Sequence, residues 1–110
     1  MTILGVPSTF LFTALDQILP LPSSNEPALV HIQVIGAGTL SLQLEDSYDG
    51  GVTYAPVRLL QAVDGAQSIV TALAGLYRQL TVAIMVSGRI RCSSYTSGTM
   101  RAYAAVNSIR

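Results

Sequence analysis

Few side chains in this sequence are of the types that perform acid, base or nucleophilic chemistry. The densest group is acidic and consists of Glu45, Asp46 and Asp49. A paired-carboxylate hydrolase needs two such groups facing each other across a substrate cleft, and the spacing does not match a calcium-binding EF-hand loop. Asp is common in turns because its side chain bonds nearby backbone. We therefore interpret this group as part of a turn.

His31 is the only histidine and Cys92 the only cysteine. A zinc site needs several His or Cys ligands, which this chain lacks. Cys92 alternates with apolar positions and has no activating neighbour, which favours a buried thiol over a nucleophile paired with His31. The short run Gly36-Ala37-Gly38 does not form a dinucleotide-binding fingerprint. We expect no catalytic residue, no cofactor and no metal, and a protein that is not an enzyme.

The arginines form the one basic group in the sequence. Arg89 and Arg91 share a predicted strand face, and Arg101 is expected on the adjacent strand, with Tyr95 and Tyr103 nearby. Arginines interleaved with aromatic residues can bind single-stranded nucleic acid. The net charge is zero, however, so nothing draws the protein toward nucleic acid or an anionic membrane. We interpret these arginines and Tyr103 as candidate subunit-interface residues.

The composition also indicates contact with other proteins. Only 11% of the 110 residues are charged and 50% are hydrophobic, whereas an ordinary soluble domain has about 25% charged residues. Part of the apolar surface is expected to meet another protein; the alternative is a monomer with a neutral polar surface. No apolar run reaches the roughly 18 residues of a membrane helix. The apolar N-terminus lacks the basic start of a signal peptide, and a single cysteine fits folding in the cytoplasm.

Period-two alternation of apolar and polar residues recurs along the chain and is typical of half-buried β-strands. The clearest runs are Val30 to Val34, Thr39 to Glu45, Ile90 to Cys92 and Met100 to Val106. Leu80 to Val86 is apolar on both faces, which predicts a central strand or one that meets a neighbour.

Glycine-containing turns separate these runs. We predict turns at Asp49-Gly50-Gly51, Asp64-Gly65, Gly36 to Gly38 and Thr96-Ser97-Gly98. Pro56 predicts an edge strand or a bulge, because proline has no N–H to donate to a neighbouring strand. Ser68 to Gly75 fits either a short strand or a single helical turn.

Seven or eight strands at this spacing predict an all-β fold, an antiparallel β-sandwich or a jelly-roll-like barrel. The domain is expected over residues 29–110. Residues 1–28 read either as an extended N-terminal arm on a neighbouring subunit or as a first strand followed by a Pro-rich connector. The candidate interface residues of the arm are Ile3, Leu4, Phe10 and Phe12.

Four segments, in this order, resemble a known group of proteins. They are SLQLEDSYDGGVTYAPV (Ser41 to Val57), AGLYR (Ala74 to Arg78), GRIR (Gly88 to Arg91) and SYTSGTMRA (Ser94 to Ala102). Over roughly residues 38–106 the chain resembles the small β-sandwich virion proteins of tailed bacteriophages, including capsid decoration or cement proteins. The chain departs from that pattern at Tyr54, where the family often has Trp, and in the doubly apolar run Leu80 to Val86.

The resemblance implies a non-enzymatic virion component that binds the major capsid protein or other virion proteins. Such proteins are often trimers seated on the capsid surface at junctions between shell subunits. Two alternatives stay open. One is a tail, neck or baseplate subunit of the virion, and the other is a carbohydrate-binding β-sandwich that stacks sugars on Tyr48, Tyr54, Tyr77, Tyr95 or Tyr103.

Overall fold

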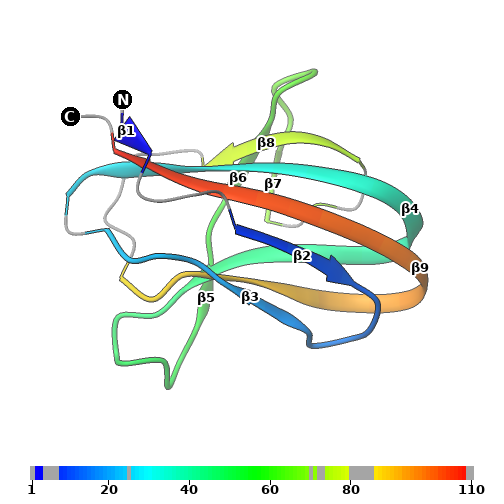
Figure 1. Cartoon of the computed structure of the whole chain (residues 1–110), viewed down its shortest axis with the longest axis horizontal. Coiled ribbons are helices and arrows are strands. Elements are labelled where there is room, and N and C mark those ends of the chain that lie inside the picture. The colour runs from blue at the N-terminus through cyan, green and yellow to red at the C-terminus, as the bar shows by residue number, and fades with distance from the viewer. Residues whose placement is uncertain are drawn as a thin grey trace.

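The computed structural model of this chain describes residues 2–3, 8–24, 26–69, 71, 74–79 and 86–108 (Figure 1). Leu4 and residues 80–85, which include most of the doubly apolar run, lie outside these ranges. The described residues form β-strands, turns and loops. The strands are β1 (Thr2–Ile3), β2 (Ser8–Phe12), β3 (Ile18–Pro20), β4 (Ala28–Asp46), β5 (Ala55–Pro56), β6 (Leu59–Gln61), β7 (Gln67–Ser68), β8 (Gly75–Gln79) and β9 (Arg89–Ser108).

Two very long strands organise the fold. β4 and β9 pair antiparallel along almost their whole length, from Ala28 opposite Ser108 to Glu45 opposite Arg89. The two strands bend together at the far end of the molecule, so that each has one half in an upper layer and the other half in a lower layer (Figure 1). A single hydrogen-bonded sheet of nine strands is thereby folded over into two layers, which confirms the predicted all-β fold.

The short strands extend the two layers. In the upper layer β8 pairs with the first half of β4, β6 pairs with β8 and β7 with β6, while β1 and β2 pair with the second half of β9. In the lower layer β3 pairs with the first half of β9 and β5 with the end of β4. Thr71 also reaches the lower layer, where its backbone forms an isolated bridge with Leu42.

The alternating runs point into the space between the layers, as predicted. Side chains of β4 at even-numbered positions are buried in both halves of the strand, and even-numbered side chains of β9 face them. The same alternation exposes odd-numbered positions on the outer faces. The buried hydrophobic core consists of Phe12, Leu19, Leu21, Ala28, Val30, Ile32, Val34, Leu40, Leu42, Leu44, Leu59, Tyr77, Ile90, Cys92, Met100, Ala102, Ala104 and Val106.

Two of the predicted turns do not exist as chain reversals. Residues 36–38 lie within β4 and residues 96–98 within β9, opposite one another, so both glycine segments belong to one shared bend. Gly36 and Gly98 have φ values of +116° and +87°, a region that other residues adopt only with strain. Two register shifts, between Thr39 and Leu40 and between Ser41 and Leu42, add β-bulges that increase the local twist.

The other two turns lie where they were predicted. The Asp49-Gly50-Gly51 segment is in the loop of residues 47–54 between β4 and β5, and Asp64-Gly65 joins β6 to β7. Pro56 lies in β5, a two-residue strand at the edge of the lower layer, as expected of a residue without an N–H.

Residues 8–12 belong to the domain itself. As β2 they pair with residues 100–104 of β9, and β1 pairs with the end of the same strand. The sequence left open an arm on a neighbouring subunit and a first strand of the domain; within the single chain, these residues pair with its own β9. The chain then turns at residues 13–17 and enters β3, so the Pro-containing segment expected as a connector begins within a strand.

Candidate interaction surface

The candidate interface residues predicted from the sequence do not form one surface. Phe12 is 0% exposed and contacts Phe10 edge to face, with ring centroids 4.8 Å apart. The interface role assigned to Phe12 is therefore corrected to a core role, and Phe10 packs partly buried against the same core. Leu4 lies outside the described residues, and of Ile3 only the backbone pairing with Asn107 is described.

The predicted arginine stripe is also divided. Arg89, Arg91 and Arg101 are all on β9, but the bend places Arg101 in the upper layer and the other two in the lower layer. The expectation that Arg101 lies on a strand adjacent to Arg91 is therefore wrong. A glycine in a chain reversal and a glycine in a bend leave the same local signal, so the sequence pattern did not separate these cases.

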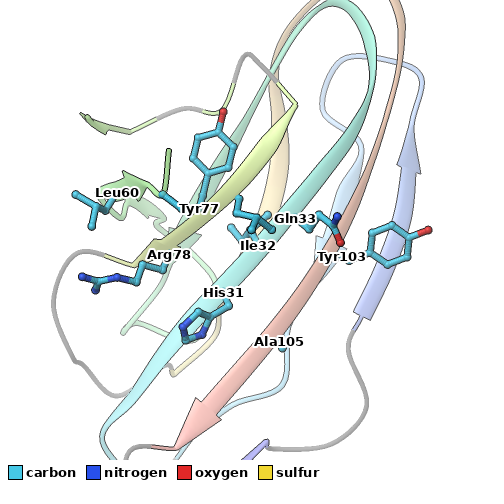
Figure 2. A pocket seen from close by; sticks show the side chains of 10 residues that line it. His31, Ile32, Gln33, Leu60, Tyr77, Arg78, Tyr103 and Ala105 are labelled. Carbon is cyan, nitrogen blue, oxygen red and sulfur yellow. The ribbon is translucent and has the colours of Figure 1, made fainter. Parts of the chain in front are cut away.

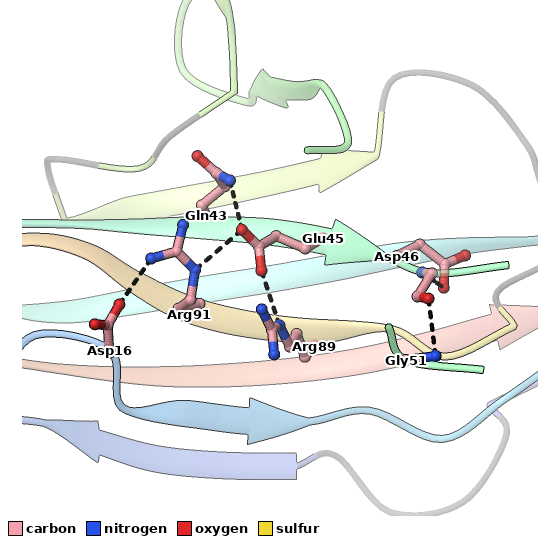
Figure 3. A network of polar contacts seen from close by, with 8 residues as sticks. Asp16, Gln43, Glu45, Asp46, Gly51, Arg89 and Arg91 are labelled. Carbon is pink, nitrogen blue, oxygen red and sulfur yellow. Dashed lines mark hydrogen bonds and ion pairs between the residues drawn. The ribbon is translucent and has the colours of Figure 1, made fainter. Parts of the chain in front are cut away.

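Arg89 and Arg91 converge on one buried carboxylate, which the sequence interpretation had assigned to turn chemistry. The Oε1 atom of Glu45 accepts a hydrogen bond from Arg89 Nε at 2.8 Å, and its Oε2 atom accepts one from Arg91 Nε at 3.1 Å (Figure 3). The Glu45 side chain is only 4% exposed. Burial alone would raise the pKa of Glu45, but the hydrogen bonds and charges of the two arginines outweigh it and hold that pKa below its ordinary value.

Neighbouring groups complete this network. Arg91 Nη1 pairs with Asp16 Oδ1 at 2.9 Å, and Gln43 Nε2 donates to Glu45 Oε2 at 2.6 Å. The guanidinium carbon of Arg89 lies 3.5 Å from the centre of the Tyr54 ring, within cation–π range. The charges of Arg89 and Arg91 are thus compensated within the chain. We assign this network to holding β4, β9 and the turn of residues 13–17 together rather than to contacts between subunits.

Asp46 and Asp49 fix the backbone of two loops, as the turn interpretation predicted. Asp46 accepts hydrogen bonds from the backbone N–H groups of Ser47, Val86 and Ser87, which ties the end of β4 to the segment before β9. No group of three or more His, Cys, Asp or Glu side chains suitable for a metal ion occurs among the described residues.

The loop of residues 47–54 has a defined internal structure. Asp49 Oδ1 accepts hydrogen bonds from Ser47 Oγ at 2.7 Å and from the backbone N–H groups of Val52 and Thr53 at 3.1 and 2.9 Å. The Thr53 N–H and the Ser47 hydroxyl are the main groups that lower the pKa of Asp49 to about 2. At neutral pH the loop therefore presents an ionised carboxylate, next to the highly exposed side chain of Val52.

The upper layer carries a groove on its outer face. It has a volume of about 350 Å³, within the range of about 300–1,000 Å³ typical of ligand-binding pockets. Odd-numbered side chains of β4 and β9 form its floor, and β6 and β8 form one side (Figure 2). We call it the outer groove; it is lined by His31, Ile32, Gln33, Leu60, Ala62, Leu76, Tyr77, Arg78, Tyr103 and Ala105.

The outer groove is mostly apolar, with the polar groups of His31, Gln33 and Arg78 in its lining. Leu76 and Tyr103 remain exposed there, on opposite sides of Gln33, with which both are in register. His31 Nδ1 lies 2.6 Å from Asn107 Nδ2, which orients the imidazole ring against β9. Of the predicted interface residues, Tyr103 is the one that lines this groove.

The outer face continues beyond the groove. Ile35 and Leu11 flank Arg101 in adjacent strands, and both apolar side chains are exposed. On this face, the described residues of β2, β6, β8, residues 28–38 of β4 and residues 99–108 of β9 include Arg78 and Arg101 but no carboxylate. In the described part of the chain, every ion pair involves Arg89 or Arg91, so the outer face carries two positive charges without a compensating negative one.

The remaining candidates for chemistry lie apart. Cys92 points into the core of the lower layer, whereas His31 lies on the outer face of the upper layer, so the two do not form a nucleophile–base pair. Among the tyrosines, Tyr77 is buried and one face of Tyr54 is covered by Arg89. The described residues contain no helix long and apolar enough to cross a membrane.

Comparison with known proteins gives one structural likeness. No family model matches the sequence, and no curated protein matches it. The fold is similar to that of YomS, a protein derived from the SPBc2 prophage, with a TM-score of 0.56 and 11% sequence identity. The match covers 97% of this chain and 100% of YomS. The likeness in fold therefore extends over nearly the whole length of both chains.

Proposed function

We propose that this chain is a non-enzymatic structural component of a bacteriophage virion, and that it acts as a capsid decoration protein. The observation that carries the proposal is the end-to-end fold similarity to a prophage-derived protein. The resemblance of residues 38–106 to small virion proteins of tailed phages supports the same origin.

The surface chemistry supports a role in assembly. The outer groove and the exposed Leu11 and Ile35 form an apolar surface bordered by uncompensated arginines, a combination that is common where proteins bind one another. The histidine, the cysteine and the carboxylates of the described chain are separated or engaged in structural bonds. Rigid strands and paired charges are sufficient for a protein whose task is to bind.

The proposed action is to cement the head. Each copy binds at a junction between subunits of the major capsid protein, as part of a homo-oligomer for which we favour a trimer. Each contact would bury about 1,600 Å², the standard size for a stable interface. Because the copies of an oligomer bind together, their combined affinity exceeds that of a single contact, and this would raise the temperature or pressure at which the shell ruptures. The protein would fold in the host cytoplasm and reside on the capsid surface.

The test is the number of copies in purified virions of the phage that encodes the chain, measured by quantitative mass spectrometry against the major capsid protein. A decoration protein is expected in a fixed ratio to the shell subunits. With on the order of one oligomer bound at each shell junction, the virion would hold tens to hundreds of copies. Six or twelve copies would instead identify the tail, neck or baseplate subunit considered above. Absence from virions would refute a virion role of any kind.

A further inference from the structure

The outer face is the strongest candidate for a contact that the fold itself leaves unfilled. It combines a concave apolar groove with Arg78 and Arg101, and the parts of the described strands that form it, including residues 28–38 of β4 and 99–108 of β9, carry no carboxylate. Arg78 Nη1 donates only to the carbonyl of Gln79, and Arg101 Nη1 reaches the hydroxyl of Thr9 at 3.4 Å. A partner for this face must therefore be convex, partly apolar and negatively charged.

The charges decide which part of a second copy could bind. If two copies met through the same face, the arginines on its strands would oppose one another, and the nearest carboxylate, Asp64, lies in the turn at the rim of the groove. A symmetric dimer through the outer face is thus disfavoured. The groove must instead receive a different, acidic surface, so that the contact is head to tail.

The loop of residues 47–54 has the required properties. Within residues 47–54 the chain has one carboxylate, Asp49, and no cation, and the nearby Arg89 is held against Tyr54 and Glu45. Val52 is 82% exposed at the loop surface, and Asp49 is an exposed, ionised carboxylate. In Figure 1 this loop projects from the end of the lower layer, whereas β6 and β8 lie on the other side of the molecule.

The loop is also held in shape before it meets a partner. Asp49 accepts three hydrogen bonds within it, and Ser47 Oγ accepts a fourth from the Gly51 N–H. Binding a preformed loop costs less conformational entropy than ordering a flexible one. The other acidic turn, at Asp64, adjoins Ala62 on the rim of the groove itself, so it is less suited to fill the groove of a neighbour.

We propose that copies of this chain associate head to tail, with the loop of residues 47–54 of one copy seated in the outer groove of the next. Val52 enters the apolar part of the groove, and Asp49 faces Arg78. Repetition of this contact forms a ring when the rotation between successive copies closes on itself and an open filament when it does not. The inference rests on the proposed assembly role and names the surfaces through which the homo-oligomer forms.

The experiment is the solution mass of the purified full chain, measured by light scattering over a concentration series. The wild type is expected as an oligomer. Arg78→Glu in the groove should raise the dissociation constant at least tenfold because it places a second negative charge opposite Asp49. Val52→Arg in the loop should raise it by a similar factor because it brings a charge into the apolar part of the groove. Leu15→Arg is the matched control, since Leu15 is an exposed apolar residue in the turn before β3, away from both surfaces.

Leu76→Ser gives a second groove variant, and it should weaken association by lost apolar contact if Arg78→Glu fails to fold. A wild-type chain that stays monomeric, or an oligomer that neither Val52→Arg nor Leu76→Ser weakens, would overturn the inference. Either result leaves the virion role intact if the chain is still found in particles. If the variants weaken the oligomer as expected but the chain is absent from virions, the head-to-tail contact stands and the proposed function is refuted.

Discussion

Gly38 and Gly98 face each other at the shared bend so closely that a Cβ atom on Gly98 would lie 2.4 Å from the Cα atom of Gly38. No side chain fits between the two backbones there. The close approach allows β4 and β9 to bend together without separating, and it is this bend that turns one sheet into two layers. The fold therefore depends on glycine at a position where no other residue can be accommodated.

Gly98→Ala is expected to destabilise the protein strongly. The positive φ of this residue costs about 1–2 kcal/mol for an L-residue, and the clash with backbone adds an overpacking cost of about 1–3 kcal/mol. The melting temperature should fall by about 10 °C or more. Gly50→Ala is the matched control, because Gly50 also has a positive φ but has nothing within 4 Å of its added Cβ atom. Equal melting temperatures for the two variants would contradict the role of close packing.

Glu45→Ala should cost more stability than removal of any exposed carboxylate. It leaves Arg89 and Arg91 without their shared partner, and breaking hydrogen-bonded, buried charge pairs costs about 2–4 kcal/mol. Asp16→Ala removes the exposed partner of Arg91 and should cost less than about 1 kcal/mol. Urea unfolding of both variants measures the difference. Similar losses in the two would show that Glu45 does not organise the network.

Stability should decrease in acid. The pKa of Glu45 is held below its ordinary value of 4.5, and that of Asp49 is lowered from 3.8 to about 2. Carboxyl groups with a lower pKa in the folded state stabilise it fully above their unfolded pKa and lose that contribution as the pH falls. We expect the free energy of unfolding in urea to be level near neutral pH and to decline from about pH 4.5 downward. If a Glu45→Gln variant loses as much unfolding free energy in acid as the wild type, the pH dependence must come from groups other than Glu45.

Cys92 should be unreactive in the native protein. Burial raises the pKa of its thiol, and the Sγ atom donates to the Ser94 carbonyl at 3.3 Å. Since the thiolate is the reactive form, a thiol reagent at neutral pH should label the folded chain very slowly and the unfolded chain fully. Rapid labelling under native conditions would mean that the lower layer opens around this position.

The alternation of residues 39–45 and 100–106 was enough to predict strands, the buried face and the class of fold. It was not enough to predict that four expected strands are two, because a glycine turn and a glycine bend differ only in where the partner strand lies. The Glu45 network was missed for a related reason: Arg89 and Arg91 are 44 and 46 residues away, and only the pairing of β4 with β9 brings them together.

The outer groove shows the same limit. Leu76, Arg78 and Tyr103 belong to strands whose neighbours are set by the topology of the whole sheet, so their common surface leaves no pattern in the sequence. Phe12 illustrates the opposite error. An apolar residue near a chain terminus fits both an interface and a core, and its burial follows from the pairing of β2 with β9.

The most direct test of a capsid-cementing role is the temperature at which purified heads rupture, with and without the protein, followed by release of the packaged DNA. Heads that lack the chain should rupture at a lower temperature, and addition of the purified wild-type chain should restore the original value. Heads that rupture at the same temperature in all three preparations would contradict the proposal that this protein stabilises the shell.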